Sequence, residues 1–179
     1  MKKEECSFLK KRTKKLLSLV LAVTLSSCGF HPLYAPGGRQ EAALQAIYVP
    51  IIPDRTGQLL RQALQQRLEG DDSAVAKRYE LSISYFKTTA NLDVQADNST
   101  TRARDVGTAV WRLHPAGNAS DTLTSGTVRS VDGYNIIDEQ FFYMDLSEEA
   151  AQHRIADALA DQIVTGLALY FHKHPDKAS

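Results

Sequence analysis

The chain has 179 residues and a formal net charge of zero, which hides an uneven distribution. Seven of its 21 Lys/Arg but only two of its 21 Asp/Glu lie in residues 1–27, so residues 28–179 carry a net charge of about −5. An acidic domain argues against nonspecific nucleic-acid binding, which depends on Lys and Arg to neutralise phosphates. The only cysteines are Cys6 and Cys28, so the rest of the chain has no thiol for a disulfide, a zinc site or a nucleophile.

The N-terminal segment has the pattern of a secretory signal. Its start is rich in lysine, and Leu16 to Leu25 then supply an apolar core that is too short to span a bilayer. Leu25-Ser26-Ser27-Cys28 follows and resembles the bacterial lipobox. By that resemblance residues 1–27 are removed and Cys28 is lipidated. The alternative is an ordinary signal peptide with a chance cysteine near the cut.

The residues after Cys28 predict a tether and then a first strand. Residues 28–43 include Pro32, Pro36 and three glycines, and we expect an extended, lipid-anchored tether. No aspartate follows the cysteine, which by analogy points to the outer membrane. Leu44 to Ile52 is rich in Ile, Val and Tyr, as strands are, and is closed by Pro53.

The middle of the chain predicts a helix followed by a three-stranded meander. Apolar residues recur at spacings of three and four from Gly57 to Glu69, with Thr56 as the expected N-cap. Alternating patterns then predict strands at Tyr79–Tyr85, Thr100–Leu113 and Thr122–Val131. A loop at Asn91–Ser99 and a hairpin turn at His114–Ser120 are expected between them.

The end of the chain predicts a long amphipathic helix. Residues 132–146 are apolar without clean periodicity, and we expect partly extended chain that buries its aromatic side chains. Ser147 is the expected cap of a helix that runs to about Phe171, and residues 173–179 are expected to form a frayed polar tail. The whole predicts an α+β fold: a two-layer sandwich of β-α-β-β-β-α order, with about four strands and two helices on one face, spanning residues 44–172.

Two stretches carry a resemblance to a known family. Cys28-Gly29-Phe30-His31-Pro32-Leu33-Tyr34 resembles the start of the alphaproteobacterial branch of the LptE family, in which arginine is usual at the position of His31. Ala150 to Phe171 and the order of elements are also similar. The resemblance implies an outer-membrane lipoprotein, on the periplasmic side, that plugs the LptD β-barrel, helps it assemble, and binds lipopolysaccharide during its delivery to the outer leaflet.

Three arginines are the candidate ligand-binding residues. Arg102 and Arg104 share one face of a predicted strand, and Arg129 lies on the next predicted strand. Guanidinium groups match phosphate oxygens, so these residues are candidates for contact with the phosphates of lipid A. The alternative is that they are surface cations paired with Asp93, Asp97 or Asp105, and Arg112 is a fourth cation of the same kind.

No combination of residues predicts catalysis, a metal site or a cofactor. His172, His174 and Asp176 have the composition of a metal cluster, but a solvated tail lacks the preorganised ligands that a metal needs. The isolated histidines, including His114, are expected to be turn or surface residues, and adjacent carboxylates point apart. Two other functions are weighed: an auxiliary lipoprotein of an envelope lipid-transport ABC system, and an envelope enzyme, for which no convergent catalytic group is present.

Overall fold

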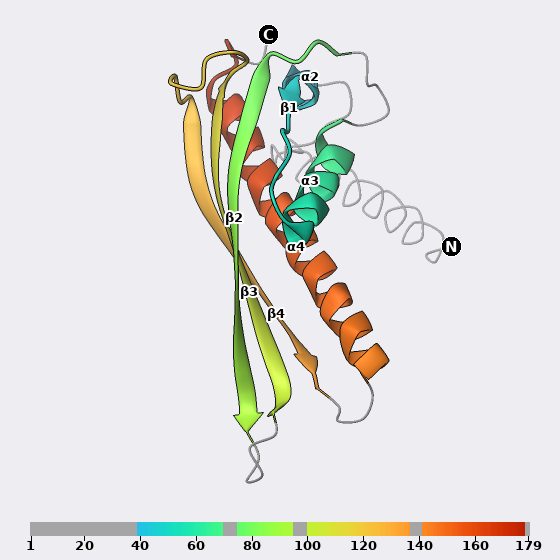
Figure 1. Ribbon diagram of the computed structural model, residues 1–179. Helices are drawn as coiled ribbons and strands as arrows, with labels where there is room; N and C mark the ends of the chain where they lie inside the picture. Colours follow the sequence, from blue (N-terminus) through green and yellow to red (C-terminus); the bar gives the residue numbers. More distant parts are fainter. Residues whose placement is uncertain (1–38, 70–74, 95–99, 137–140, 178–179) are drawn as a thin grey trace, which may run out of the picture. The chain divides into compact units, whose positions relative to one another are not determined.

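The computed structural model of the protein describes residues 39–69, 75–94, 100–136 and 141–177 (Figure 1). These residues belong to one compact unit, Pro36–Ser179. The elements in chain order are helix α2 (Arg39–Gln45), strand β1 (Ile47–Tyr48), helix α3 (Arg55–Leu68), strands β2 (Tyr79–Val94), β3 (Thr100–Pro115) and β4 (Thr124–Asn135), and helix α4 (Phe141–Lys173). None of the described helices is long and apolar enough to cross a membrane.

The sheet is mixed and its strands lie in the order β1-β2-β3-β4. The two-residue β1 pairs with β2 in parallel, whereas β2–β3 and β3–β4 are antiparallel. The predicted meander is therefore present, with strands longer than expected. Alternating sequence continues past Tyr85, and β2 extends to Val94 opposite Thr100, so the first four residues of the expected loop at Asn91–Ser99 are strand.

Helices α3 and α4 form the second layer. Helix α4 lies along β3 and β4, and α3 packs against α4 (Figure 1). The two helices run in the same direction, because Arg55 at the start of α3 contacts Glu149 and Arg67 near its end contacts Asp161. The expected α+β sandwich, with a four-stranded sheet packed against helices, is confirmed.

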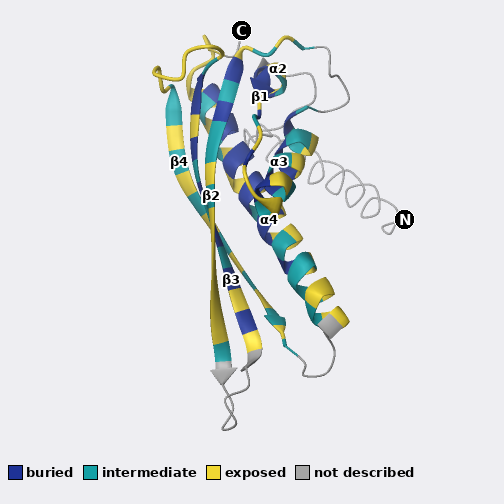
Figure 2. Cartoon of the chain, viewed as in Figure 1, coloured by how far each residue is buried: buried dark blue, intermediate teal, exposed yellow. Residues whose placement is uncertain are grey.

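Burial alternates along the strands and marks the side of the sheet that faces the helices. On β3, Ala103, Asp105, Ala109, Trp111 and Leu113 are all buried (Figure 2). Gly107 lies in the same row, and a Cβ atom there would stand 2.5 Å from Cγ2 of Ile155 on α4. The missing side chain is therefore what allows α4 to approach the centre of β3 closely.

The N-terminal part of the domain differs from the prediction. The expected strand Leu44–Ile52 contains only Ile47 and Tyr48 as strand, and α2 begins at Arg39, inside the expected tether. Ala43 and Leu44 in α2, and Ala46 directly after it, are buried. The strand ends early because Pro50 and Pro53 have no N–H to donate to a ladder.

The expected helix caps were also wrong. Helix α3 begins at Arg55, its N-cap position is Asp54 with φ 67°, and no side chain caps it, so Thr56 lies inside the helix. Thr56 instead forms a hydrogen bond with the hydroxyl of Tyr85 on β2. Ser147 likewise lies within α4, which begins six residues earlier.

The stretch between β4 and α4 holds the largest correction. We expected residues 132–146 to be partly extended and to bury their aromatic side chains. Instead β4 continues to Asn135, α4 begins at Phe141, and Phe142, Tyr143 and Leu146 are exposed. These three side chains lie on the surface of α4, and no other part of the described chain covers them.

The described C-terminal residues make contacts with the rest of the domain. The Tyr79 hydroxyl donates a hydrogen bond to the carbonyl of Lys177. The His174 ring stacks on Tyr170, and its Nδ1 lies 3.0 Å from the Tyr170 carbonyl. The hydrogen bond between Tyr79 and Lys177 joins the described C-terminal residues to the start of β2.

Candidate functional site on the outer face of the sheet

The three predicted arginines lie on the side of β2, β3 and β4 that is turned away from the helices, which we call the outer face. Because Ala103 and Asp105 face inward, Arg102 and Arg104 face outward, and both are exposed. Arg129 is exposed in the corresponding outward row of β4. The strand alternation predicted from sequence therefore places all three on one surface.

The register shows how far apart these cations stand. Arg102 and Arg104 are two residues apart on β3, about 7 Å along the strand. Arg129 pairs with Thr108, four residues from Arg104, which corresponds to about 13 Å. The three guanidinium groups therefore form a pair and a separate single cation, rather than one cluster around a single anion.

Exposed apolar side chains accompany the two cationic positions: Val131 lies in a row between those of Arg104 and Arg129, and Phe86 lies in the row of Arg129 itself. Phe86 of β2 lies opposite Thr108 and is 60% exposed, and Val131 of β4 lies opposite Val106 and is 51% exposed. A surface depression of about 270 Å³ adjoins them, lined by Arg102 and Arg104 together with Leu92, Ala103, Val131, Asp132 and Gly133. Cations and exposed hydrocarbon therefore alternate along this face.

The outer face has no negative charge of its own between the rows of Ser82 and Leu92. The outward residues of β2, β3 and β4 in these rows are Ser, Thr, Ala, Leu, Phe, Val, Gly, Asn and Arg. Arg112, opposite Ser125, is the fourth arginine on it. Among the described residues none of these arginines forms an ion pair, and the proposed partner Asp105 faces the helices. Asp93 and Asp97 have no described side chains.

Two carboxylates, Asp105 and Glu148, lie on the opposite side, between the sheet and α4. The ammonium of Lys87 lies 3.6 Å from the fully buried Asp105 and 3.0 Å from Glu148 on α4. Burial opposes the charged form of Lys87, but the hydrogen bond to Glu148 and the charge of Asp105 outweigh it and raise its pKa. Burial also raises the pKa of the neighbouring Tyr134, as does the charge of Asp105. These two carboxylates are thus on the side away from the outer face.

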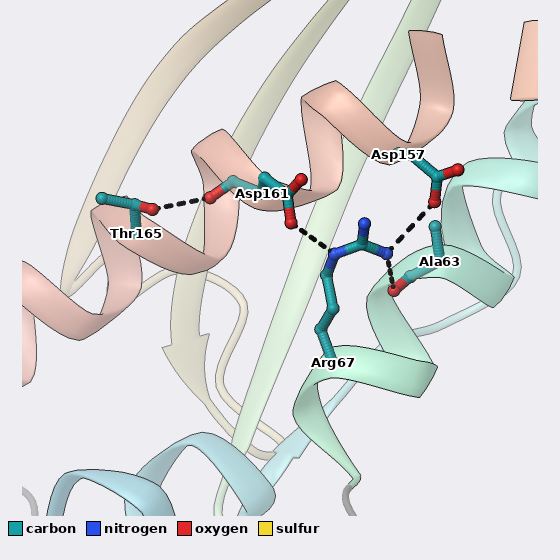
Figure 3. Close-up of polar contacts among 5 residues, drawn as sticks. All are labelled: Ala63, Arg67, Asp157, Asp161 and Thr165. Carbon is teal, nitrogen blue, oxygen red and sulfur yellow. Dashed lines mark hydrogen bonds and ion pairs between the residues drawn. The ribbon is translucent and has the colours of Figure 1, made fainter. Parts of the chain in front are cut away.

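A second set of ion pairs joins the two long helices (Figure 3). Arg67 of α3 donates from Nε to Asp161 at 2.6 Å and from Nη1 to Asp157 at 3.2 Å, and also to the carbonyl of Ala63. The hydrogen bond to Asp161 raises the pKa of Arg67, despite partial burial. These contacts hold α3 against α4. None of them involves a residue of the outer face.

The remaining sequence candidates are placed as follows. Cys28 and His31 lie outside the described residues. His114 is not a surface residue, because it is 3% exposed and its Nε2 is 2.8 Å from the Ser82 hydroxyl. In the described part of the chain no three His, Cys, Asp or Glu side chains are grouped so as to hold a metal ion.

The comparisons with known proteins identify the family. The model of the LptE lipopolysaccharide-assembly family matches residues 44–167. The chain belongs to the LptE family. Membership confirms the expected class, a non-enzymatic lipoprotein of lipopolysaccharide assembly. No curated protein sequence matches this LptE-family chain.

Solved structures share the fold of this LptE-family chain. A lipoprotein of Caulobacter crescentus is 24% identical, with a TM-score of 0.61 over 75% of this chain and 98% of its own. Rare lipoprotein B of Shewanella oneidensis is 11% identical, with a TM-score of 0.53 over 72% of this chain and 96% of its own. At these identities the likeness concerns the fold alone.

Proposed function

We propose that the chain is an outer-membrane lipoprotein, anchored through Cys28 on the periplasmic side, that plugs an LptD-type β-barrel and binds lipopolysaccharide on the outer face of its sheet. The observation that carries the binding part is the outer face itself, with four arginines, exposed apolar side chains between them and no carboxylate in the described rows. Family membership supports the assembly part.

The chemistry of lipopolysaccharide matches this surface. Its lipid A portion carries phosphate groups at separate positions and several acyl chains. Guanidinium groups bind phosphate through paired hydrogen bonds, and Arg129 stands about 13 Å along the sheet from Arg104. Val131 offers hydrocarbon between them and Phe86 offers it in the row of Arg129, where an acyl chain gains from leaving water. We infer that Arg102 and Arg104 bind one phosphate region and Arg129 another.

The polarity of the strands is compatible with a place inside a barrel. Its strands are rich in Thr and Ser, and the lumen of an outer-membrane barrel is polar. Affinity purification from detergent-solubilised envelopes is expected to recover the LptD-type barrel. Recovery of a substrate-binding or permease component instead would favour the ABC-system alternative and contradict the proposal.

Binding is tested with the acylated protein in detergent and purified lipopolysaccharide. The variant with Arg102→Ala, Arg104→Ala and Arg129→Ala is expected to bind at least about tenfold more weakly, which corresponds to a loss of about 1.4 kcal/mol. A control with Arg55→Ala, Lys173→Ala and Lys177→Ala removes the same charge from exposed positions of the helices and the C-terminal end. Equal binding by the wild type and the outer-face variant, or an equal loss in the control, would contradict the proposal.

Separate phosphate contacts are tested by removing one phosphate from the ligand. The wild type is expected to bind diphosphoryl lipid A more tightly than monophosphoryl lipid A. If Arg129 binds one phosphate, Arg129→Ala reduces that difference, whereas Arg55→Ala, in helix α3, leaves it unchanged. A difference that persists in Arg129→Ala and in the Arg102→Ala/Arg104→Ala variant would place the phosphates elsewhere.

A further inference from the structure

The start of α4 carries an exposed apolar cluster that no part of the described chain covers. Phe142 is 84% exposed, Tyr143 51% and Leu146 56%. Their spacing of one, three and four residues places them on adjoining positions of the helix surface. We call these three residues the α4 tip, and the first turns of α4 are largely exposed in Figure 2. A cluster of this kind on an otherwise well-packed domain is typical of a contact site.

The α4 tip projects beyond the rest of the helix layer. The first residue of α3, Arg55, contacts Glu149, and Phe142 lies seven residues earlier on α4. At a rise of about 1.5 Å per residue the tip extends about 10 Å past the start of α3. The next turns of α4 are held in place from two sides, by Lys87 of β2 on Glu148 and by Asp132 of β4 on Arg154. The tip is therefore presented from a fixed platform, which lowers the ordering cost of binding.

The charge around the tip restricts what can cover it. Residues 141–152 contain Asp145, Glu148 and Glu149 and no Lys or Arg. Glu149 is paired with Arg55, but Lys87 shares its one positive charge between Glu148 and Asp105, and Asp145 is exposed with no ion pair in the described chain. The described first turns of α4 and their ion-pair partners therefore keep a net negative charge. They repel an anionic lipid surface, lipopolysaccharide and a second copy of the same tip alike.

From the exposed cluster and its charge we propose that the α4 tip docks into an apolar pocket, rimmed by Lys or Arg, on the barrel protein of the proposed function. The inference rests on that function and adds the surface that the barrel meets. The inference assigns a different ligand to each surface. The cationic outer face binds an anionic amphiphile, and the acidic, apolar tip binds a protein. Buried aromatic side chains dominate the affinity of protein interfaces, so Phe142 and Tyr143 are the expected anchors.

The test co-expresses the full-length lipoprotein with the LptD-type barrel of the same genome and measures the barrel recovered per lipoprotein. Replacing the tip by serine (Phe142→Ser, Tyr143→Ser, Leu146→Ser) is expected to reduce recovery about tenfold or more. The matched control replaces three exposed apolar residues elsewhere, Tyr48, Ile51 and Leu169, by serine and is expected to retain most of the recovery. Failure of the wild type to recover the barrel overturns the proposed function and this inference together. Recovery by the tip variant at the wild-type level overturns this inference alone, as does an equal loss in the control.

Charge reversal and crosslinking give independent readouts. Asp145→Lys opposes a basic rim and is expected to weaken recovery severalfold, while stronger recovery would overturn the proposal. A photo-crosslinking amino acid at position 142 is expected to label the barrel, and at position 169 to label it much less. Labelling at position 142 that is confined to lipid or to a second copy of the lipoprotein would overturn it as well.

Discussion

At the scale of single residues, Asp105 has the least common environment in the domain. It is fully buried, its Oδ1 accepts a hydrogen bond from the Thr89 hydroxyl at 2.6 Å, and its Oδ2 accepts none within the described part of the chain. The nearest cation, the ammonium of Lys87, stands 3.6 Å from Oδ2. A buried carboxylate costs several kcal/mol of folding free energy unless a nearby charge compensates it. The positive charge of Lys87 offsets this cost for Asp105.

Removing that cation is expected to destabilise the fold. Lys87→Met leaves Asp105 uncompensated and is expected to lower the free energy of unfolding by about 3 kcal/mol, measured by urea denaturation. Adding Asp105→Asn removes the buried charge but keeps an oxygen for Thr89, and the double variant is expected to regain more than half of the loss. A single variant as stable as the wild type would show that Asp105 is compensated in another way.

Sequence reasoning found the exposed arginines but not this buried pair, for a physical reason. The period of a strand fixes which side chains share a face, so Arg102 and Arg104 could be placed together before the fold was known. Period two also places Lys87 and Asp105 inward, where a charged residue is rarely expected. Only the register of β2 against β3 and the position of Glu148 on α4 show why they are accepted there.

At the scale of elements, two arginines of α3 form ion pairs with α4, and the two are expected to contribute differently to stability. The Arg67 side chain is 26% exposed and bonds two aspartates and a carbonyl, whereas Arg55 is 74% exposed and meets Glu149 alone. Solvent screening and side-chain entropy reduce an exposed pair to little, while a less exposed network keeps more of its Coulomb energy. The two arginines therefore form a matched comparison on one helix.

Arg67→Ala is expected to cost about 1 kcal/mol in the free energy of unfolding, and Arg55→Ala less than about 0.5 kcal/mol. Both values come from denaturant titrations of each variant beside the wild type. Equal losses would mean that solvent exposure does not decide the strength of these pairs. A larger loss for Arg55→Ala would mean that the start of α3 depends on Glu149.

Which elements could be predicted depended on the regularity of their pattern. Strands β2, β3 and β4 and the main part of α4 have clean periods of two or of three and four, and they were found. Residues 39–45 and 141–146 are short or aromatic segments whose conformation depends on tertiary context, and both were mistaken for extended chain. The exposure of Phe142 had no signal in the sequence, because an aromatic residue is usually expected to be buried.

At the scale of the whole molecule, regions of different charge and polarity lie on different parts of the described chain. The outer face is cationic and partly apolar, the space between sheet and α4 holds compensated charges, and the α4 tip is apolar and acidic. A protein that contacts a lipid and a protein partner at the same time requires surfaces of this kind, because one surface cannot serve both. The outer face and the α4 tip also belong to different elements, so each surface can be altered without changing the other.

The proposed location of the molecule depends on Cys28. If this residue is acylated, the mature protein begins at position 28, its N-terminal peptide carries lipid, and the protein sediments with the outer membrane. Each buried CH₂ of an acyl chain contributes about 0.8 kcal/mol to membrane binding, so several chains make release slow. Cys28→Ser prevents acylation and is expected to block removal of residues 1–27, leaving an unacylated precursor retained by its signal segment in the inner membrane.

Mass spectrometry of the N-terminal peptide and fractionation of the two membranes measure both consequences. A control with Cys6→Ser, in the segment that is removed, is expected to mature and localise as the wild type does. A wild-type protein that begins at another residue and is free in the periplasm would contradict the anchor. That result would leave the fold and the outer face as described. A different attachment would then have to hold the protein at the proposed barrel.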